Sequence, residues 1–408
     1  MKMTKYKLGE LVEVTRGVSL SGQFYAEEGK LIRLTLGNFN MNGGGFKENT
    51  SKTDLYFTGT VRDEFILNKG DIITPLTEQS LGLLGTTARI PESGKYIQSQ
   101  DVALVRCKEG LLDPNFCYYL ISSSIVRQQL SAAAQQTKIR HTSPEKIKDS
   151  TVWVPDFEVQ KNIGRILTDI DNKIAINRRI NDNLEAMAKQ LYDYWFVQFD
   201  FPNEEGKPYK SSGGVMVWNE KLKREIPQGW NDCKIKDFMR IFTGKKDVSK
   251  AVPGNYKFFS CAPEPISSNE YIYDGYAVLV SGNGSYTGRV GFYKGKFDLY
   301  QRTYACVLDE DEHNISFFYY TLRYLFQPIY SGGKHGSSIP YIVLGDLADF
   351  RFAFNETICT KFVDATKPMF DEQLLRQKEI EALTKQRDEL LPLLMNGQAT
   401  VNYHLSAC

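Results

Sequence analysis

The sequence has few of the residues from which metal centres and disulfide frameworks are built. Only four of its 408 residues are histidine, and none of them stands in an HxH or HxxxH pair. The seven cysteines are scattered and never form a CxxC pair, so the sequence predicts neither a zinc site nor a disulfide framework. We therefore expect no bound metal and a reducing, cytoplasmic location.

Long apolar segments are also missing. No run of 18 apolar residues occurs, which argues against a membrane-spanning helix, and residues 1–10 lack the apolar stretch of a secretory signal. Hydrophobic residues make up 42% of the chain and charged residues 24%, as is usual for folded globular proteins. A chain of this length and composition predicts two or three domains.

The common catalytic and nucleotide-binding motifs are absent as well. There is no GxxxxGK[ST] phosphate-binding loop and no Asn/Asp-Pro-Pro-aromatic motif of the kind that amino-methyltransferases carry. The glycines of residues 282–288 do not have the register of a dinucleotide-binding loop and are more typical of a hairpin turn. The sequence therefore predicts no catalytic residue and no cofactor.

What the sequence does contain is an internal repeat. Three pairs of segments align in the same order, namely 7–17 with 234–244, 115–120 with 316–321, and 163–174 with 363–374. The first pair keeps a constant shift of 227 residues and places Gly17 on Gly244, whereas the later pairs have shifts of 201 and 200, which indicates loop deletions in the second copy. The order of segments predicts a domain and a long helix, followed by a second domain and a second long helix.

The first part of each copy predicts a domain of the mixed α/β class. Short strands are expected among turns rich in glycine and serine, at 71–74, 101–105, 276–280 and 304–308. An aromatic helical stretch follows in each copy, at 116–130 and at 317–330, and its tyrosines are best explained as core residues. The expected divisions are a first domain at 1–155, a central helix at 156–200, a connecting segment at 201–230, a second domain at 231–355, and a C-terminal helix and tail at 356–408.

The two long helical segments carry apolar residues at the alternating spacing of three and four that is typical of coiled coils, beginning at Ile163, Ile166 and Ile170. A helix from about 158 to 196 would be roughly 60 Å long and could not bury this stripe inside one small domain. We expect the two helices of the chain to pair with each other. Because the first helix leads from one domain to the other, the pair must be an intramolecular antiparallel coiled coil, with the domains at its two ends related by a pseudo-two-fold axis.

Three polar residues interrupt the apolar stripes, namely Lys173 and Asn177 in the first helix and Arg387 in the second. Polar residues in a coiled-coil seam commonly fix the register of pairing at some cost in stability. We favour this structural role over a chemical one.

Several segments together resemble the DNA-sequence-specificity subunit of Type I restriction–modification systems. They are QLYDYWFVQFDFP at 190–202, LKREIPQGW at 222–230 and LLRQKEIEALTKQRDELLPLLMNG at 374–397, within a duplicated plan that spans the whole chain. The resemblance implies a subunit without catalytic activity, with two target-recognition domains that each read one half of a split DNA site. It also implies that the helical spacer docks two methyltransferase subunits and, in the full complex, restriction subunits that act as motor and nuclease.

Long polar side chains on loops are the candidates for reading base edges, because Arg pairs with guanine and Asn or Gln with adenine. In the first domain they are Arg33, Asn38, Gln79, Ser80, Arg89, Gln98, Gln100, Lys138, Arg140 and His141. In the second they are Lys245, Lys246, Asn283, Arg289, Gln301, Arg302, Lys334, His335 and Ser338. Segments 138–141 and 334–341 occupy the same place in the repeat, so we rank them first.

Aromatic residues are concentrated at the end of the first long helix. Some of them are expected to cap the core between the helices, and the others to contact a partner subunit, because so much aromatic area on an isolated helix would be an exposed patch. The candidates for partner binding are Tyr192, Tyr194, Trp195 and Phe196.

Two other classes of protein stay open at this point. A fused restriction or modification enzyme could carry a catalytic motif that the sequence does not reveal. A coiled-coil scaffold without a role on DNA would explain the helices, but it would not explain two copies of a glycine-rich, aromatic α/β domain. The net charge of +1 is small for a nucleic-acid-binding protein and suggests that partner subunits supply part of the attraction to DNA.

Overall fold

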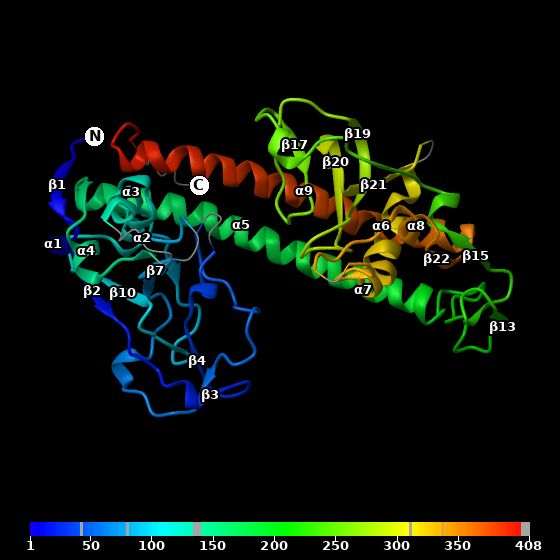
Figure 1. The fold of residues 1–408 in the computed structure, drawn as a ribbon, viewed down its shortest axis with the longest axis horizontal. Coiled ribbons are helices and arrows are strands. Elements are labelled where there is room, and N and C mark those ends of the chain that lie inside the picture. Colours follow the sequence, from blue (N-terminus) through cyan, green and yellow to red (C-terminus); the bar gives the residue numbers. More distant parts are fainter. Residues whose placement is uncertain (41–43, 79–80, 134–139, 310–311, 337, 401–408) are drawn as a thin grey trace. The chain divides into compact units, whose positions relative to one another are not determined.

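The computed structural model describes residues 1–40, 44–78, 81–133, 140–309, 312–336 and 338–400 (Figure 1). The chain forms two compact units. Unit 1 comprises Met1–Asn177 and Lys378–Cys408, and unit 2 comprises Arg178–Gln377. The long helices α5 (Phe157–Tyr192) and α9 (Glu356–Met395) therefore contribute residues to both units.

Unit 1 is a mixed α/β structure. Its strands are β1 (Thr4–Lys7), β2 (Val12–Arg16), β3 (Tyr25–Ala26), β4 (Leu31–Arg33), β5 (Tyr56–Phe57), β6 (Ile72–Pro75), β7 (Thr77–Glu78), β8 (Ala88–Arg89), β9 (Tyr96–Ile97), β10 (Val102–Cys107), β11 (Arg140–His141) and β12 (Thr151–Val154). Its shorter helices are α1 (Leu8–Leu11), α2 (Pro114–Ser122), α3 (Ser124–Ala133) and α4 (Pro144–Lys148). Two four-stranded sheets have the orders β2-β10-β6-β8 and β3-β5-β4-β9, and two further pairs are β1-β12 and β7-β11.

Unit 2 has the same class of fold with one larger sheet. Its strands are β13 (Met216–Asn219), β14 (Arg224–Pro227), β15 (Asn231–Lys234), β16 (Arg240–Thr243), β17 (Tyr256–Phe259), β18 (Ile266–Ser268), β19 (Tyr273–Ser281), β20 (Val290–Leu299), β21 (Thr303–Val307) and β22 (Arg351–Phe354). Its shorter helices are α6 (Ile315–Thr321), α7 (Gln327–Tyr330) and α8 (Leu344–Ala348). The six-stranded sheet has the order β16-β21-β19-β20-β17-β18. Residues 282–289 join the antiparallel strands β19 and β20, so the predicted hairpin is confirmed.

The internal repeat is visible in the register of the strands. In unit 1, Thr4 pairs with Val154 at the start of the β1-β12 ladder, and in unit 2 Asn231 pairs with Phe354 at the start of the β15-β22 ladder. These positions keep the shifts of 227 and 200 residues that the sequence alignment requires. Gly17 and Gly244 also occupy equivalent places, because each lies against the backbone of the segment that precedes the strand β10 or β21.

In unit 1, the first half of α5 packs antiparallel against the second half of α9 (Figure 1). Ile170, Ile174 and Ile380 form the apolar part of this seam. Asp171 of α5 contacts Arg387 of α9, and Asn177, further along α5, contacts Glu379, which comes earlier in α9. The two helices therefore run in opposite directions. The predicted antiparallel pairing is thus present.

The polar seam residues of unit 1 have specific partners. The Arg387 Nη1 atom lies 2.9 Å from Asp171 Oδ1, Lys173 Nζ lies 2.5 Å from Glu379 Oε1, and Asn177 Nδ2 donates to Glu379 Oε2 at 2.9 Å. Because each of these polar groups on one helix is matched on the other, a shift in register would separate the charges. The contacts agree with the register-setting role.

In unit 2, the second half of α5 packs antiparallel against the first half of α9 and against α6. The Gln373 Nε2 atom donates to the Asn181 carbonyl at 3.3 Å, and the ring of Tyr192 lies 5.9 Å from that of Phe362. α5 is followed by a wider helical turn, Asp193–Val197, which continues the helix to the end of the predicted segment.

The aromatic residues at the end of α5 belong mainly to the core of unit 2. Tyr192, Trp195 and Phe196 are buried, and they lie among other aromatic residues of α6, α9 and the connecting segment. This corrects the prediction that they face a partner subunit, because the second domain itself covers them. Tyr194 is the exposed member of the group, with 37% of its surface accessible.

Among the described residues, no helix combines the length and the apolar character that crossing a membrane would require.

Candidate nucleic-acid interface

Three loops of unit 2 meet beside the ends of the strands β19 and β21. The amide of Ile342 donates to the Gly282 carbonyl at 2.9 Å, and the amide of Gly282 donates to the Arg302 carbonyl at 2.9 Å. Asn283 forms an isolated bridge with Tyr341. These contacts bring together the hairpin loop 282–289, the turn 300–302 and the segment 334–341, which hold most of the candidates of the second domain.

A fourth segment joins the same place. The amide of Gln301 donates to the Lys246 carbonyl at 3.0 Å, so Lys245 and Lys246 lie next to the turn that carries Gln301 and Arg302. A pocket of about 210 Å³ opens here, lined by Gly282, Gln301, Arg302, Tyr304 and Ile342. The exposed candidates around it are Lys245, Gln301, Arg302, Lys334, His335 and Ser338.

The segment 334–341 is held by contacts within unit 2. His335 and Tyr341 form an isolated bridge, and their rings stack with centroids 5.2 Å apart. The His335 Nε2 atom lies 3.1 Å from Asp346 Oδ2 on α8, and the Lys334 ammonium lies 4.2 Å from the centre of the Tyr330 ring. These contacts hold the exposed side chains of Lys334 and His335 beside Tyr330 and α8.

Two candidates of unit 2 are engaged in the scaffold. Lys246 contacts Glu270 and lies 3.1 Å from the buried carboxylate of Asp298, and its hydrogen bond to Glu270 raises the pKa of the ammonium. Arg289 donates to the Ala262 carbonyl at 2.5 Å, and burial lowers the pKa of its guanidinium. In the structure these two side chains hold neighbouring loops together, whereas the sequence predicts that they read bases.

Unit 1 repeats the central feature of the site. His141 pairs with Thr77 and Arg140 pairs with Glu78 in the β7-β11 ladder, and the amide of Thr142 donates to the Leu76 carbonyl at 2.8 Å. These contacts are the counterparts of Tyr341 with Asn283 and of Ile342 with Gly282 in unit 2. Residues 140–142 of unit 1 and 341–342 of unit 2 are therefore anchored at the same position in the two units.

Several candidates of unit 1 are buried in its interior. Arg33 donates to the carbonyl of Asp54 at 3.0 Å and to its carboxylate at 3.1 Å. Asn38 and Gln98 are also buried, with hydrogen bonds to backbone groups, and the Arg89 guanidinium lies 4.7 Å from the centre of the Tyr118 ring. The structure thus assigns Arg33, Asn38 and Gln98 to the scaffold, because these side chains are buried and hydrogen-bonded within the domain. Arg89 is half-buried, and its Nη2 atom has no hydrogen-bond partner among the described residues, so its role in reading DNA stays a prediction.

Other candidates of unit 1 stay available. Gln100 and His141 are exposed, and Arg140 is partly buried with contacts to Glu78 and Ser131. Gln79, Ser80 and Lys138 lie outside the described residues. As DNA-reading residues, Gln100, Arg140 and His141 stay predictions.

Sequence reasoning missed Tyr286, Glu78 and Thr287 at these loops, and it included Tyr341 only as the last residue of the segment 334–341. Tyr286 and Tyr341 are exposed aromatics on the loops of unit 2, with accessible fractions of 48% and 38%. Glu78 and Thr287 are buried polar residues that join loop segments. The two tyrosines could have been found as aromatics within polar loop sequences, whereas a single Glu or Thr beside a strand gives no such signal.

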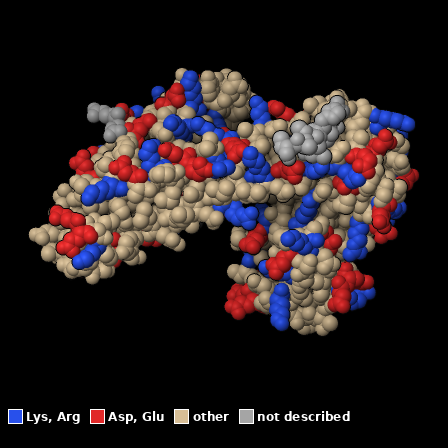
Figure 2. Space-filling model, turned by 180° about the vertical axis from the view of Figure 1, so that it is seen from behind, with Lys and Arg blue, Asp and Glu red and all other residues tan. Residues whose placement is uncertain are grey.

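The charge distribution does not mark a strongly basic surface. Figure 2 shows Lys and Arg interspersed with Asp and Glu over the visible face, in agreement with a net charge of +1. In the part of the chain that the structure describes, no group of three or more His, Cys, Asp and Glu side chains could hold a metal ion.

Comparisons with known proteins show which family the chain resembles in sequence. The family model of the type I restriction modification DNA specificity domain matches residues 1–186 and 227–354. The chain is 25% identical over 324 residues to the type I restriction enzyme MjaIX specificity subunit of Methanocaldococcus jannaschii, covering 72% of this chain and 71% of the relative. It is 32% identical over 182 residues to the EcoDI specificity subunit of Escherichia coli, covering 43% of this chain and 40% of the relative.

Among solved structures, the S subunit of a type I restriction–modification system from M. genitalium matches with a TM-score of 0.60 and 17% identity, covering 99% of this chain and 97% of that one. This likeness supports the mixed α/β fold with long helices. The names of the relatives agree with the expectation of a specificity subunit rather than a catalytic one. Because the family model matches well over half of its length, the chain belongs to the family of type I restriction modification DNA specificity domains.

Proposed function

We propose that this protein reads a bipartite DNA site, with unit 1 recognising one half-site and unit 2 the other. The observation that carries the proposal is the duplicated anchor. Residues 140–142 pair with 76–78, directly after β6, in the same way as residues 341–342 pair with 282–283, directly after β19. Two equivalent presentation sites in one chain suit a DNA target of two parts. In the same way, the two subunits of a dimeric DNA-binding protein bind two half-sites.

The exposed side chains at these sites have the chemistry that base reading needs. Arg302 can pair with guanine, Gln100 and Gln301 can pair with adenine, and Lys245 can contact phosphate. The two units differ in sequence at the equivalent positions, since His141 of unit 1 corresponds to Tyr341 of unit 2. We therefore expect the two half-sites to differ in sequence.

We further propose that the protein acts with partner subunits, namely two methyltransferase subunits and, in the full complex, restriction subunits. The small net charge supports this, because each phosphate contact contributes to affinity through the release of counterions, and few such contacts give weak binding. Tyr194 is a candidate for such contacts because it is exposed at the end of α5 next to a buried aromatic cluster.

The test is a footprint of the complex of this chain with its methyltransferase partner on DNA. We expect two protected sequence elements separated by base pairs whose identity does not matter. Insertion of one heptad near Asn177, with a matching insertion near Leu383, should lengthen the unread spacer and leave both half-sequences unchanged. A single continuous site, or protection without sequence preference, would contradict the proposal.

A further inference from the structure

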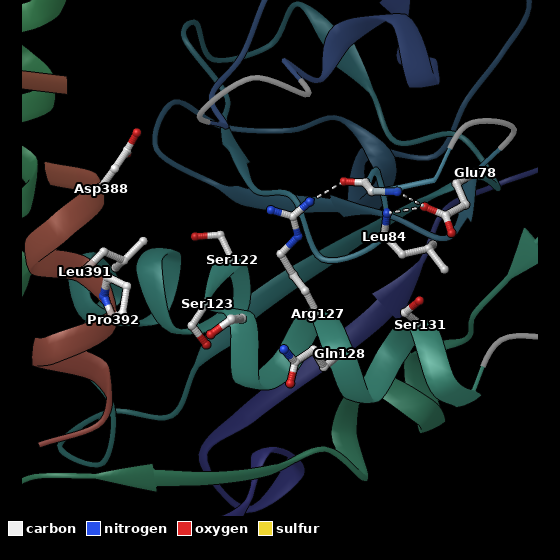
Figure 3. A pocket seen from close by; sticks show the side chains of 12 residues that line it. Glu78, Leu84, Ser122, Ser123, Arg127, Gln128, Ser131, Asp388, Leu391 and Pro392 are labelled. Atoms are coloured by element: carbon white, nitrogen blue, oxygen red, sulfur yellow. Dashed lines mark hydrogen bonds between the residues drawn. The ribbon is translucent and has the colours of Figure 1, made fainter. Parts of the chain in front are cut away.

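The turn 82–84 of unit 1, which comes after β7, is organised by one buried carboxylate. Glu78 is 2% exposed, and its Oε2 atom accepts hydrogen bonds from three successive amides, those of Gly82 at 3.0 Å, Leu83 at 2.9 Å and Leu84 at 3.0 Å. Figure 3 shows the carboxylate aimed at this turn, at one side of a pocket of about 470 Å³. A charged acceptor with three amide donors makes a stronger joint than neutral hydrogen bonds would.

The same carboxylate also holds the segment before α4. The Glu78 Oε1 atom lies 3.0 Å from Arg140 Nη1, and both side chains are largely shielded from water. On the other side of the turn, the Arg127 guanidinium of α3 donates to the Gly82 carbonyl at 2.5 Å (Figure 3). Glu78 thus ties together the turn 82–84 and the segment that presents Arg140 and His141.

Unit 2 builds the equivalent joint from different groups. The pairing places Gly284 where unit 1 has Glu78, and Pro340 where it has Arg140, and the Gly284 amide donates to the Pro340 carbonyl at 3.0 Å. The buried hydroxyl of Thr287 lies 2.6 Å from the Gly284 carbonyl oxygen and 2.9 Å from that of Pro340, between the two segments. Thr287 therefore takes the place of the side-chain joint that Glu78 makes in unit 1.

We propose that Glu78 and Thr287 are positioning residues for DNA reading, and that each sets the sequence discrimination of the half-site that its own unit reads. This inference rests on the proposed function. Both residues are buried and act through the exposed loops that they connect. A loop held in its binding shape loses less conformational entropy on binding, and it keeps polar groups within hydrogen-bond reach of the correct base only.

The experiment measures binding of the complex with its methyltransferase partner to a duplex set in which each base pair of either half-site is changed singly. We expect Glu78→Gln to lower discrimination by about tenfold in one half-site and to leave the other unchanged. The neutral glutamine side chain cannot form the ion pair with Arg140, and it accepts the three hydrogen bonds from the backbone amides more weakly. Thr287→Val should do the same in the opposite half-site. Thr287→Ser, which keeps the hydroxyl, should retain the discrimination of the original protein.

A matched control is Glu92→Gln, which makes the same chemical change in an exposed ion pair of unit 1 and should alter neither half-site. If Glu78→Gln does not fold, Glu78→Asp, which keeps the charge but shortens the reach to the amides of 82–84, replaces it in the test. Equal loss in both half-sites, or no loss in either, would overturn the inference. Absence of any two-part preference in the original complex would instead contradict the proposed function.

Discussion

Arg387 on α9 and Asp171 on α5 form a shielded ion pair across the seam of unit 1. The Arg387 side chain is 12% exposed, and its Nη1 atom lies 2.9 Å from Asp171 Oδ1. The other oxygen of Asp171 accepts a hydrogen bond of 2.6 Å from the Tyr119 hydroxyl on α2. One carboxylate therefore links three helices. Its removal would take the acceptor from the Tyr119 hydroxyl and would leave Arg387 with Asp388 as its other carboxylate partner.

We predict that Asp171→Ala lowers the free energy of unfolding by about 1–3 kcal/mol, because a shielded guanidinium loses one of its two carboxylate partners and the Tyr119 hydroxyl loses its acceptor. Chemical denaturation monitored by circular dichroism measures the change. The double variant Asp171→Leu with Arg387→Leu should recover most of the loss, since an apolar pair can replace a shielded ion pair. Additive losses in the double variant would show that the pair is not coupled.

The hydroxyls of two buried tyrosines in unit 2 should respond differently to removal. Tyr192 Oη lies 2.9 Å from Thr321 Oγ1, whereas the Tyr320 hydroxyl has no hydrogen-bond partner among the described residues. We predict that Tyr192→Phe lowers the free energy of unfolding by about 1 kcal/mol and that Tyr320→Phe leaves it unchanged or raises it. Thermal unfolding of the two variants provides the comparison, and an equal loss in both would contradict it.

Burial of these tyrosines also predicts the response to alkaline pH. Burial raises the pKa of Tyr192 and Tyr320 above the usual value, and it does the same for the thiols of Cys306 and Cys359. A group with a raised pKa in the folded state contributes its full stability below its unfolded pKa and loses it as the pH rises further. The free energy of unfolding should therefore begin to fall above about pH 8.5 from the thiols, and more steeply above about pH 10.

The slope of this decline is a direct measurement. Each tyrosine that stays protonated in the folded state contributes about 1.4 kcal/mol per pH unit above its unfolded pKa. Urea denaturation in buffers from pH 8 to 11 gives the slope, and Tyr192→Phe should reduce it by the contribution of one proton. A stability that is constant to pH 11 would contradict the prediction.

The repeat and the helix pairing could be predicted because they depend on periodic sequence signals. The alternating spacing of Ile163, Ile166 and Ile170 indicates a seam whatever the neighbouring residues are. The shift of 227 residues that aligns Gly17 with Gly244 likewise depends on sequence alone. So does the later shift of 200 residues, which gives segments 138–141 and 334–341 the same place in the repeat.

What could not be predicted depends on contacts between segments far apart in sequence. Arg33 and Arg302 have the same chemistry, and only the fold shows that Arg33 meets Asp54 inside unit 1 while Arg302 is exposed. The burial of Trp195 could not be separated from partner binding in the same way. Glu78 gives no local signal at all, because its role arises from a turn and a strand that meet only in the folded unit.

Gly17 and Gly244 should be intolerant of a side chain. A Cβ atom at Gly17 would lie 2.2 Å from the Ser99 carbonyl oxygen, and one at Gly244 would lie 1.5 Å from that of Leu299. Because backbone atoms must shift to make room, we predict that either Gly→Ala substitution lowers the free energy of unfolding by at least about 2 kcal/mol. Gly291→Ala on β20, where a Cβ meets open space, is the matched control and should cost under about 1 kcal/mol.

Lys245 and Arg302 of unit 2 should contribute to DNA binding in different ways. Both are exposed next to the pocket formed by the loops, but an ammonium acts as a point charge on phosphate, whereas a guanidinium can form two hydrogen bonds with guanine. We predict that Lys245→Gln weakens binding to all sequences alike and reduces the slope of log affinity against log salt by about one.

Arg302→Gln should instead cost about 1–3 kcal/mol on the correct sequence and relax specificity at one position of one half-site. Titrations of the methyltransferase complex at several salt concentrations, on the correct duplex and on duplexes with single changes, separate the two effects. If both variants lowered affinity equally on every duplex, Arg302 would be a phosphate contact, and the reading of bases in unit 2 would have to be assigned to the other exposed side chains of the loops, Gln301 and His335.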